Sequence, residues 1–410
     1  MFKFTFANRT FQSFSSVDFR LLWIASMGTS GGYFFQQVCI GWVTYELTNS
    51  AFITALALAL DTLPNLFGAP LGGVLVDRLN KQKILIFGPC YQFILSVGFG
   101  IGVYLDKIEV WHILTFVFLM GCSWILIEPA RMAITADMLD RSKLINGFAL
   151  TQLAFSISRL VGPGVGGVLI SMYGPAAAVF AGAVVQMIAV LMASRITTRI
   201  NPTENLTFGS MLYGFGGSIQ IVLKTPVVQG LLLLSFLGPM VLIPFGNNLL
   251  PVFNAEVFDL GPKELGLMLS SIGVGTIVGT TILASIGNIK RPGLILVFSS
   301  LLGTLSLIIL AQSKSMLVAT IACLFIGMAF TGLQTLLSVM LQQSVPEEFR
   351  GRIAGLFMAS WGTVIFGSLV AGNLAENYGA PLSTWVGAIV VIVYATIVML
   401  VYKTLFKSQA

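Results

Sequence analysis

The stretch Gly73-Val-Leu-Val-Asp77-Arg78-Leu-Asn80-Lys81-Gln-Lys83 is the densest patch of charge in a chain in which only 9% of residues are charged. Four ionic groups fall within the seven positions from Asp77 to Lys83, and long apolar runs flank them on both sides. A transmembrane helix needs roughly 20 predominantly apolar residues. The stretch is therefore predicted to be a short turn that joins two membrane helices at the water surface.

The composition excludes an ordinary soluble domain. Apolar residues make up 56% of the 410 residues, and the mean hydropathy is +0.92. Segments this apolar span a bilayer as helices, because a helix satisfies its backbone hydrogen-bonding groups internally. The 43 glycines fit this class, since small residues let membrane helices approach closely. We expect an all-α integral membrane protein embedded in a lipid bilayer.

Twelve apolar runs are predicted as transmembrane helices. Their approximate limits are 18–47, 51–76, 83–105, 111–136, 143–172, 175–197, 225–253, 263–285, 291–312, 315–342, 350–378 and 382–405. The even number places both termini on one side, and seventeen of the 22 Lys and Arg residues fall on that side. Only Lys107, Lys263 and Lys314 fall on the other. Cytoplasmic loops carry the excess of bases, so both termini are predicted to be cytoplasmic in a bacterial-type plasma (inner) membrane.

The longest polar stretch lies midway along the chain and predicts a linker between two six-helix halves. The predicted domains are an N-terminal cytoplasmic segment 1–17, a first bundle 18–197, a cytoplasmic linker 198–224, a second bundle 225–405 and a cytoplasmic tail 406–410. The halves look duplicated. Shifted by 205 positions, five residues coincide with identical ones: Gly162, Gly167, Leu169, Tyr173 and Gly174 with Gly367, Gly372, Leu374, Tyr378 and Gly379. Two such halves form a known transporter plan, with the substrate site between them near mid-membrane.

Several kinds of chemistry are not indicated. The four cysteines lie inside apolar segments without C-x-x-C spacing and are interpreted as small core residues. The sequence contains no G-x-x-x-x-G-K-[ST] phosphate loop, metal-ligand cluster or nucleophile–base pair, so we predict no cofactor, no metal and no enzymatic activity. The net charge of +6 is dispersed over loops, which indicates membrane topology rather than nucleic-acid binding.

The Asp77 turn suggests a conformational latch. A carboxylate at the end of the predicted helix 51–76 can accept hydrogen bonds from the exposed amides of a neighbouring helix N-terminus. Arg78 is within reach of an acid such as Asp137. A latch of this kind would hold one conformation and release in the other. The alternative is a solvated loop of topology markers, which suits Lys81 and Lys83 but explains Asp77 poorly.

This turn resembles the motif G-x-x-x-D-[RK]-x-G-x-[RK]-[RK] of the major facilitator superfamily. Gly73, Asp77, Arg78 and Lys83 match it, and Lys81 is an extra base. Asn80 stands where the family has glycine, and asparagine tolerates a left-handed turn better than most residues. The resemblance implies a major facilitator fold of two pseudo-symmetric six-helix bundles.

A second motif, Ser158-Arg159-Leu-Val-Gly162-Pro163-Gly164-Val-Gly166-Gly167, lies in the predicted helix 143–172. Gly-Pro kinks a spanning helix, and glycines on one face allow close packing against another helix. A generic kinked helix is the alternative. The spacing resembles the g-x-x-x-G-P-x-x-G-G element of exporters and antiporters of the superfamily, with Ser158 in place of the first glycine, and so implies efflux.

The N-terminal third resembles the secretion-effector branch of the superfamily. The matching segments are Phe19-Arg20-Leu-Leu-Trp23, Gly32-Tyr-Phe-Phe-Gln36-Gln37-Val-Cys-Ile-Gly41-Trp42 and Tyr45-Glu46-Leu-Thr. That branch contains drug and siderophore exporters, including enterobactin-type and macrolide exporters. The resemblance implies a small-molecule substrate of this kind.

Charges inside the predicted helices are candidates for proton coupling, because each costs roughly 2.5–3.5 kcal/mol at mid-bilayer on insertion scales. Asp61 lies in the middle of the predicted helix 51–76 and is the first candidate. Glu128 and Arg131, one turn apart on one face, come second. Removal from water favours the protonated form of a carboxyl group. The alternatives are structural: a neutralising Glu128–Arg131 pair, and a permanent pair between Asp61 and Arg159.

Uncharged polar residues supply candidates for the substrate cavity. The run 225–253 is interrupted at Asn247 and Asn248, between Pro244 and Pro251, which indicates a broken helix that presents two amides to the cavity. A hinge near the outer end of the helix is the alternative. The remaining cavity candidates are Gln36, Gln37, Gln334 and Trp361.

Together these patterns predict a monomeric secondary active transporter. We expect it to export a small apolar or amphipathic molecule, such as a drug or siderophore, by alternating access and in exchange for protons. An uncoupled facilitator or a lipid or lysolipid flippase is the alternative, and a transport-inactive membrane scaffold or receptor is a remote one.

Overall fold

The computed structural model describes residues 12–140, 143–197, 222, 224–286, 291–346 and 349–402. Within these ranges the chain is helical and contains no β-strand. The first half comprises η1 (Gln12–Ser15), α2 (Val17–Thr48), α3 (Ala51–Ala57), η2 (Leu60–Thr62), α4 (Leu63–Arg78), α5 (Lys81–Tyr104), α6 (Val110–Met138), α7 (Leu144–Tyr173) and α8 (Pro175–Ser194). The second half comprises α10 (Pro226–Ser235), η3 (Gly238–Asn247), α11 (Leu250–Val252), η4 (Phe253–Val257), α12 (Pro262–Ile286), α13 (Pro292–Gln312), α14 (Met316–Gln343), α15 (Arg350–Ala359), η6 (Ser360–Thr363), α16 (Val364–Tyr378) and α17 (Ala380–Val401).

In the described part of the chain, eleven helical segments are long and apolar enough to cross a membrane. They coincide with eleven of the twelve predicted runs, so the predicted all-α multi-pass membrane fold is confirmed. The first predicted run, 18–47, corresponds to α2, a 32-residue helix rich in Gly, Ser, Thr and Gln. Its small residues pack closely against α7 and α8. A twelfth crossing, by α2, stays a prediction.

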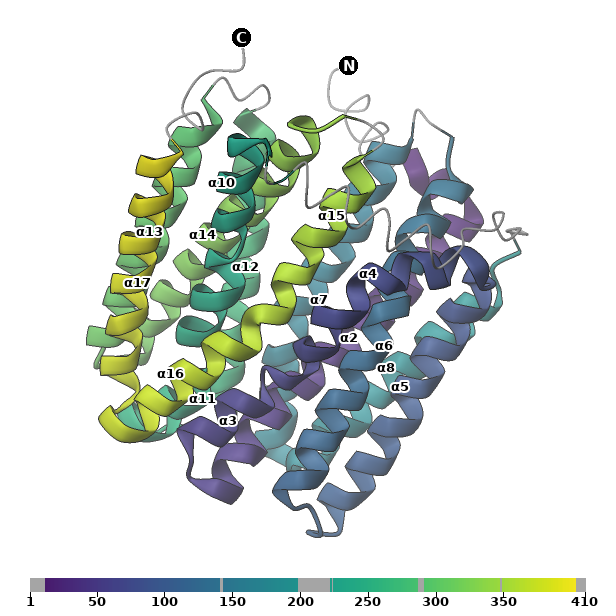
Figure 1. Cartoon of the computed structure of the whole chain (residues 1–410). Helices are drawn as coiled ribbons and strands as arrows, with labels where there is room; N and C mark the ends of the chain where they lie inside the picture. The colour runs from purple at the N-terminus through teal and green to yellow at the C-terminus, as the bar shows by residue number, and fades with distance from the viewer. Residues whose placement is uncertain are drawn as a thin grey trace, which may run out of the picture.

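The helices form two neighbouring bundles, purple and blue for the first half and green and yellow for the second (Figure 1). They meet where α7 packs against α12 and where α3 and α4 pack against α16, η6 and α15. We call the end where α4 finishes and α5 begins the Lys81 end, and the end where α2 finishes the Asn49 end. The predicted linker, except residues 222 and 224, and the C-terminal tail lie outside the described residues, as do residues 1–11 of the predicted N-terminal segment.

The ends of α7 and α16 have the same backbone turn. Gly174 ends α7 with φ 85°, and Gly379, 205 positions later, ends α16 with φ 87°. These are the only glycines with positive φ among the described residues. Positive φ is easy only for glycine, and each glycine is followed by a proline in the first two positions of the next helix, Pro175 in α8 and Pro381 in α17. This shared turn supports the predicted duplication of the halves.

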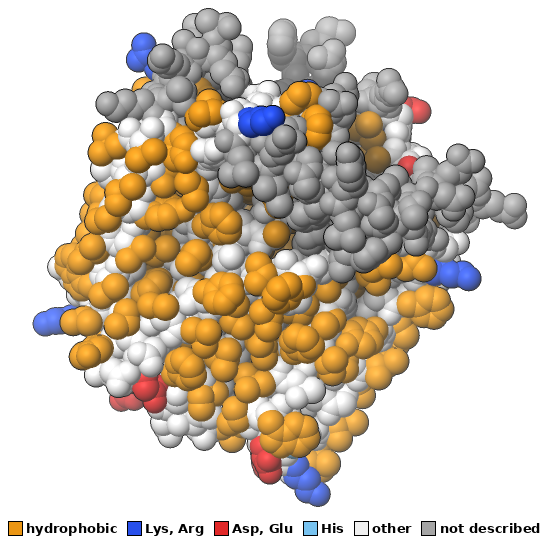
Figure 2. Space-filling view, viewed as in Figure 1, with side chains coloured by type: hydrophobic (Ala, Val, Ile, Leu, Met, Phe, Trp, Pro, Cys, Tyr) orange, Lys and Arg blue, Asp and Glu red, His pale blue; other side chains and the backbone are white. Residues whose placement is uncertain are grey.

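The outer surface of the bundles is apolar. Figure 2 shows hydrophobic side chains across the middle of one face, with the visible charges near its margins. Large exposed side chains such as Phe67, Phe87 and Phe298 belong to this surface. An apolar band of this size is unfavourable in water but matches the hydrocarbon interior of a membrane.

Three of the predicted spans are not regular α-helices throughout. The run 51–78 is interrupted by the 3₁₀ turn η2, two residues before Pro64, which has no N–H to continue an α-helical ladder. The run 226–257 winds as π-helix over η3 and η4, around Pro239 and Pro244. The run 350–378 passes through the 3₁₀ turn η6. Such irregular winding is frequent at functional sites.

Candidate transport site

We had predicted that Asp61 lies inside a regular helix. It lies instead in the break of the second span. It is the middle residue of η2 and is only 8% exposed. Tyr33 on α2 donates its hydroxyl proton to Oδ2 at 2.6 Å. Oδ1 is also buried, and no side chain of the described residues donates to it; the backbone amides of Asp61 and Thr62 lie beside the carboxyl group. The two oxygens of this carboxyl group therefore differ in their side-chain partners.

The position of Asp61 is fixed by close backbone packing. A Cβ added at Gly121 of α6 would lie 2.1 Å from the carbonyl oxygen of Asp61, so only glycine fits there. The ring of Tyr33 is held edge-on by Phe34 and Trp124, at centroid distances of 5.1 and 5.6 Å. Both partners of the Tyr33–Asp61 bond are thus held in place by neighbouring helices.

A small pocket of about 20 Å³, room for about one water molecule, lies beside Asp61, between α2, the broken second span and α6. Its lining is Tyr33, Gln36, Gln37, Ile40, Ala57, Leu58, Asp61, Val117 and Met120. The sequence-predicted residues Asp61, Gln36 and Gln37 are therefore brought together. No Lys, Arg or His is among the lining residues, so the pocket has one acid and no base.

Behind Gln36 lies a chain of buried polar side chains that the sequence reasoning did not identify. Gln36 donates to Ser96 on α5, and Ser96 donates to Gln186 on α8 at 2.8 Å. One turn away, Gln92 donates to Ser123 on α6 at 2.7 Å. The signal was present as uncharged polar residues inside apolar runs, at positions 92, 96 and 186.

Arg159 forms no ion pair with Asp61, although both side chains are described. Its guanidinium instead lies over the ring of Phe330 on α14, with Cζ 5.6 Å from the centroid. Because α7 and α14 belong to different halves, this cation–π contact links the two bundles. A permanent Asp61–Arg159 pair, one of the alternatives predicted from the sequence, is absent.

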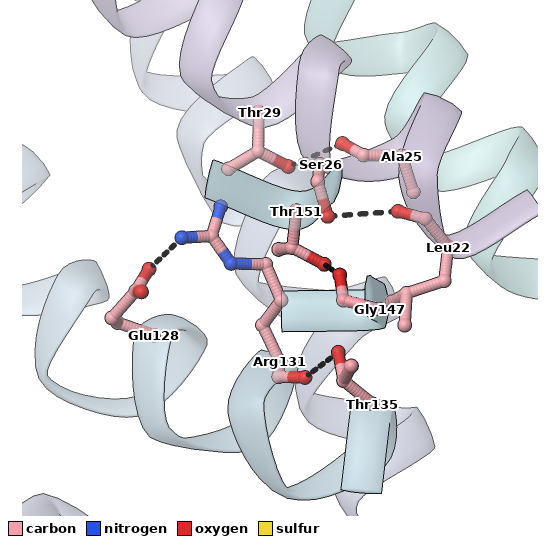
Figure 3. A network of polar contacts seen from close by, with 9 residues as sticks. All are labelled: Leu22, Ala25, Ser26, Thr29, Glu128, Arg131, Thr135, Gly147 and Thr151. Carbon is pink, nitrogen blue, oxygen red and sulfur yellow. Dashed lines mark hydrogen bonds and ion pairs between the residues drawn. The ribbon is translucent and has the colours of Figure 1, made fainter. Parts of the chain in front are cut away.

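Glu128 and Arg131 form an ion pair on one face of α6. Arg131 is only 4% exposed, and its Nε and Nη1 atoms are buried without an acceptor in the described part of the chain. Figure 3 shows the guanidinium with Ser26 and Thr29 of α2 and Thr151 of α7 nearby. The hydroxyl protons of these three side chains are donated to carbonyl oxygens of their own helices. Arg131 is therefore a buried, incompletely satisfied cation.

At the Lys81 end, Asp137 is paired with Lys81. The Nζ–Oδ2 distance is 2.8 Å, and the Lys81 side chain is largely buried. The side chains of Asp77 and Arg78, and the surroundings of Gly73, lie outside the described part of the structure, so the Asp77–Arg78 latch stays a prediction.

The sequence suggested a left-handed backbone at Asn80, and the structure does not have one. The φ of Asn80 is −69°, and it caps α5 by accepting a hydrogen bond from the Lys83 amide at 3.0 Å. Asparagine is favoured at this N-cap position. Lys83 lies in the first turn of α5, which begins at Lys81.

We had predicted that the glycines of α7 lie on one face and pack against one other helix. They instead pack against two helices. Cβ atoms added at Gly162 and Gly166 would meet Phe34 and Val38 of α2 at 2.6 and 2.8 Å. One added at Gly167 would lie 2.5 Å from the carbonyl oxygen of Pro262 on α12. Pro163 is also in this contact, and α7 continues through it as helix. The motif thus holds α7 between its own bundle and the other one.

The candidates of the second half lie apart from the pocket. Asn247 donates to Asn248 at 3.0 Å, and Asn248, which is fully buried, donates to Ser368 on α16 at 3.0 Å. These amides therefore bond one another and a neighbouring helix. Gln334 is buried, and neither end of its amide has a hydrogen-bond partner in the described residues. Trp361 lies in η6, edge-on to Phe330 at 5.5 Å.

Two acids of the second half contact the first half at the Asn49 end. Glu376 on α16 accepts hydrogen bonds from the Ser50 hydroxyl at 3.0 Å and the Phe52 amide at 3.1 Å, at the start of α3. Glu256 on η4 accepts from the Tyr45 hydroxyl of α2 at 2.8 Å. We call these the Asn49-end contacts. The sequence reasoning missed them because they depend on how the halves pack.

The fold is shared with solved membrane transporters. A bacterial homologue of the human lysosomal transporter Spinster superposes with a TM-score of 0.74 at 13% identity, covering 96% of this chain and 99% of that one. The nucleoside transporter NupG gives a TM-score of 0.73 at 16% identity, covering 94% and 99%. Identities this low show the fold alone, which is that of the major facilitator transporters.

The chain has sequence relatives that are exporters. The enterobactin exporter EntS of Shigella boydii serotype 4 is 26% identical over 378 residues, which cover 89% of this chain and 84% of that protein. Its counterpart in Salmonella typhimurium is 25% identical over the same coverage. These relatives are membrane transporters, not enzymes. The family model for transmembrane secretion effectors matches residues 8–409, so the chain belongs to the transmembrane secretion effector family.

Proposed function

We propose that this chain is a proton-coupled exporter in a bacterial-type inner membrane, with cytoplasmic termini, that moves a small apolar or amphipathic molecule outward by alternating access. Family membership and the exporter relatives support the direction of transport. The single observation that carries the coupling is Asp61, an almost fully buried carboxyl group beside a small pocket whose lining contains no base.

The geometry suggests how one proton is taken up and released. A buried carboxyl group without a nearby base is neutral at low cost and charged at high cost. The Tyr33 hydroxyl stabilises the charged form through its bond to Oδ2. Movement of α2 against the broken second span would change this balance, so Asp61 would bind a proton in one conformation and lose it in the other.

Alternating access requires contacts that exist in one state only. The Asn49-end contacts join the halves on the predicted outer side, and the α7–α12 packing lies between mid-span and that same end. Opening outward would break the bonds of Glu376 and Glu256. On the predicted cytoplasmic side the Lys81–Asp137 pair lies within the first half, beside the proposed Asp77–Arg78 latch.

The test is export into inverted membrane vesicles, with enterobactin and the dye rhodamine 6G as probes. Wild-type protein should accumulate at least one of them when the vesicles are acid inside, and should slow at least tenfold when the gradient is collapsed. Asp61→Asn should transport at the same rate with and without a gradient. Glu264→Gln, at the first turn of α12 and outside the pocket, is the control and should keep the wild-type response.

Wild-type transport that ignores the gradient would indicate an uncoupled facilitator or flippase. If the Asp61→Asn variant still responds to the gradient, Asp61 is not the coupling site. In that case Glu128→Gln becomes the next variant, because Glu128 is an acid within a span and pairs with the buried Arg131.

A further inference from the structure

The middle of the molecule contains a cation without a counter-charge. Arg159 lies at the centre of α7, and its guanidinium lies over the ring of Phe330, which is at the centre of α14. Among the described residues, no acid forms an ion pair with Arg159 and no group accepts a hydrogen bond from its side chain. The buried bases Arg131 and Lys81 differ, because each of them forms an ion pair with an acid.

An unpaired guanidinium at this depth calls for an explanation. A charged side chain in the middle of a membrane helix is costly, and such a residue is a candidate for function. The Phe330 ring offsets part of the cost through its negatively charged face, with the ring centroid 5.6 Å from Cζ. An aromatic face does not, however, accept hydrogen bonds from the N–H groups in the plane of the guanidinium. Arg159 therefore lacks a charged acceptor.

A second unsatisfied polar group lies beside Phe330. Gln334, one turn further along α14 on the same face, is only 8% exposed, and neither end of its amide has a hydrogen-bond partner in the described residues. A Cβ added at Gly238 of η3 would lie 2.9 Å from Nε2 of Gln334 and 3.1 Å from Cε2 of Phe330, so both side chains lie against the same residue. The Trp361 ring is edge-on to Phe330. We call Arg159, Phe330, Gln334 and Trp361 the mid-span cluster.

The composition of the mid-span cluster favours an anion over a cation. The cluster has one guanidinium, one amide and two aromatic rings, and no acid belongs to it. A guanidinium binds a carboxylate through two parallel N–H···O bonds, which pair the donors that the Phe330 ring leaves open. A carboxylate is therefore a better partner for Arg159 than the ring is. A cationic head group would meet the guanidinium without a neutralising acid and would be repelled.

We infer that the mid-span cluster is a subsite for the carboxylate group of an amphipathic aromatic substrate. Arg159 binds the carboxylate, and the rings of Phe330 and Trp361 contact the aromatic body. In this conformation Phe330 covers the guanidinium, and the carboxylate takes its place when α7 and α14 move apart. The inference rests on the proposed export function and deepens it by naming the substrate class.

Three probes with the same aromatic body test the head group. 2-Naphthoate, 2-naphthylmethanol and 2-naphthylmethylammonium carry an anionic, a neutral and a cationic head group at neutral pH. Their binding to the purified full-length protein in detergent is measured by thermal shift and by calorimetry, without any gradient. 2-Naphthoate should bind at least about tenfold more tightly than the alcohol, as expected for hydrogen bonds between charged groups. The ammonium probe should not bind.

Two variants and a control locate the subsite. Arg159→Gln removes the charge and should weaken 2-naphthoate binding at least about tenfold, to the level of the alcohol. Gln334→Glu nearly keeps the size of the side chain and places an acid in the mid-span cluster. It should abolish 2-naphthoate binding and admit the ammonium probe. Arg195→Gln removes an exposed base at the end of α8, outside the cluster, and should bind as wild type does.

The inference is overturned if the alcohol binds as tightly as 2-naphthoate, or if Gln334→Glu leaves the preference unchanged. It is also overturned if folded Arg159→Gln keeps its affinity; should that variant not fold, the Gln334→Glu comparison decides. These outcomes are separate from those of the vesicle assay. A preference for the carboxylate without a gradient effect removes the coupling and keeps the subsite, and the reverse pattern removes the subsite alone.

Discussion

At the scale of single residues, the Tyr33–Asp61 hydrogen bond separates two explanations of the buried acid. If Asp61 only completes the packing of the broken span, the bond matters for stability alone. If Asp61 exchanges a proton, the Tyr33 hydroxyl also sets how readily the carboxylate forms, because among the described residues it is the one donor that reaches the group from another helix.

Tyr33→Phe tests this difference. The ring contacts with Phe34 and Trp124 stay, so the loss of stability should be about 1.5–3 kcal/mol, as for a hydrogen bond to a charged group. Coupled transport per folded molecule should fall several-fold. Thermal unfolding in detergent measures the loss of stability. Gradient-driven transport into vesicles, normalised to the amount of folded protein, measures the loss of transport. Unchanged transport at reduced stability would leave the bond a purely structural role.

At the scale of helices, the closest approach between the halves runs along α7 and α12. Gly167 and Gly266 face each other there, and a Cβ added at Gly167 would lie 3.0 Å from the Cα of Gly266 as well as 2.5 Å from the Pro262 carbonyl oxygen. Such spacing lets two backbones touch inside a membrane. It also means that a single methyl group is too large for the closed contact.

Gly167→Ala should therefore force α7 and α12 apart, slow transport at least tenfold and lower stability by about 1–3 kcal/mol, the usual range for overpacking. The matched control is Gly98→Ala on α5, where an added Cβ meets no atom within 4 Å. That control should be neutral or stabilise the helix by about 0.5–1 kcal/mol. Transport rate and unfolding temperature of the two variants are compared side by side. Equal behaviour of the pair would show that the α7–α12 approach is not critical.

The positions of the helices can largely be predicted from the sequence, because the mean hydropathy of a membrane-spanning segment depends little on how the helices pack. The interruptions of the helices are harder to predict. Asp61 was placed inside a regular helix, although Pro64 already signals a break there. Asn80 was matched to a left-handed turn, whereas its side chain caps α5. In both cases the backbone conformation depends on local hydrogen bonding. The mean hydropathy of the segment carries no information about it.

The partners of the site residues depend on how the helices are rotated and packed, so sequence alone could not supply them. Tyr33 is 28 positions from Asp61, and Ser96 is 90 from Gln186. Asp61, Gln36 and Gln37, which were separate candidates because polar groups inside apolar runs are rare, nevertheless line one pocket. Asn247 and Asn248 met the same criterion, yet they bond each other and Ser368. Rarity alone therefore does not separate a substrate contact from a structural one.

At the scale of the whole molecule, the Asn49-end contacts should bias the balance between the outward-closed and outward-open forms. Glu376→Ala removes two bonds between α16 and the start of α3. The outward-closed form should lose about 1 kcal/mol of stability, which is typical of a helix cap. This loss corresponds to a roughly fivefold rise in the open-to-closed ratio. Asn377→Ala is the control, because the Asn377 amide donates only within α16.

The balance can be measured with spin labels at Leu47→Cys and Tyr378→Cys, two exposed positions at this end in different halves. Cys90 and Cys122, which are partly exposed, would first be replaced by serine. Electron–electron distance distributions should gain a longer component in Glu376→Ala and stay as in the parent protein in Asn377→Ala. Identical distributions in all three would mean that Glu376 does not hold the halves together.

The Glu376 contact also has a consequence for biosynthesis. The carboxylate that completes the first turn of α3 is 324 residues downstream of the Phe52 amide that it accepts from. The seven-residue α3 is translated and inserted long before that partner exists, and so short a helix is marginal by itself. During synthesis this segment would rest on Ser50 alone for its cap. A chain truncated before α16 should then expose residues 50–57 to membrane proteases, so that completion of the last two helices protects a segment made near the beginning.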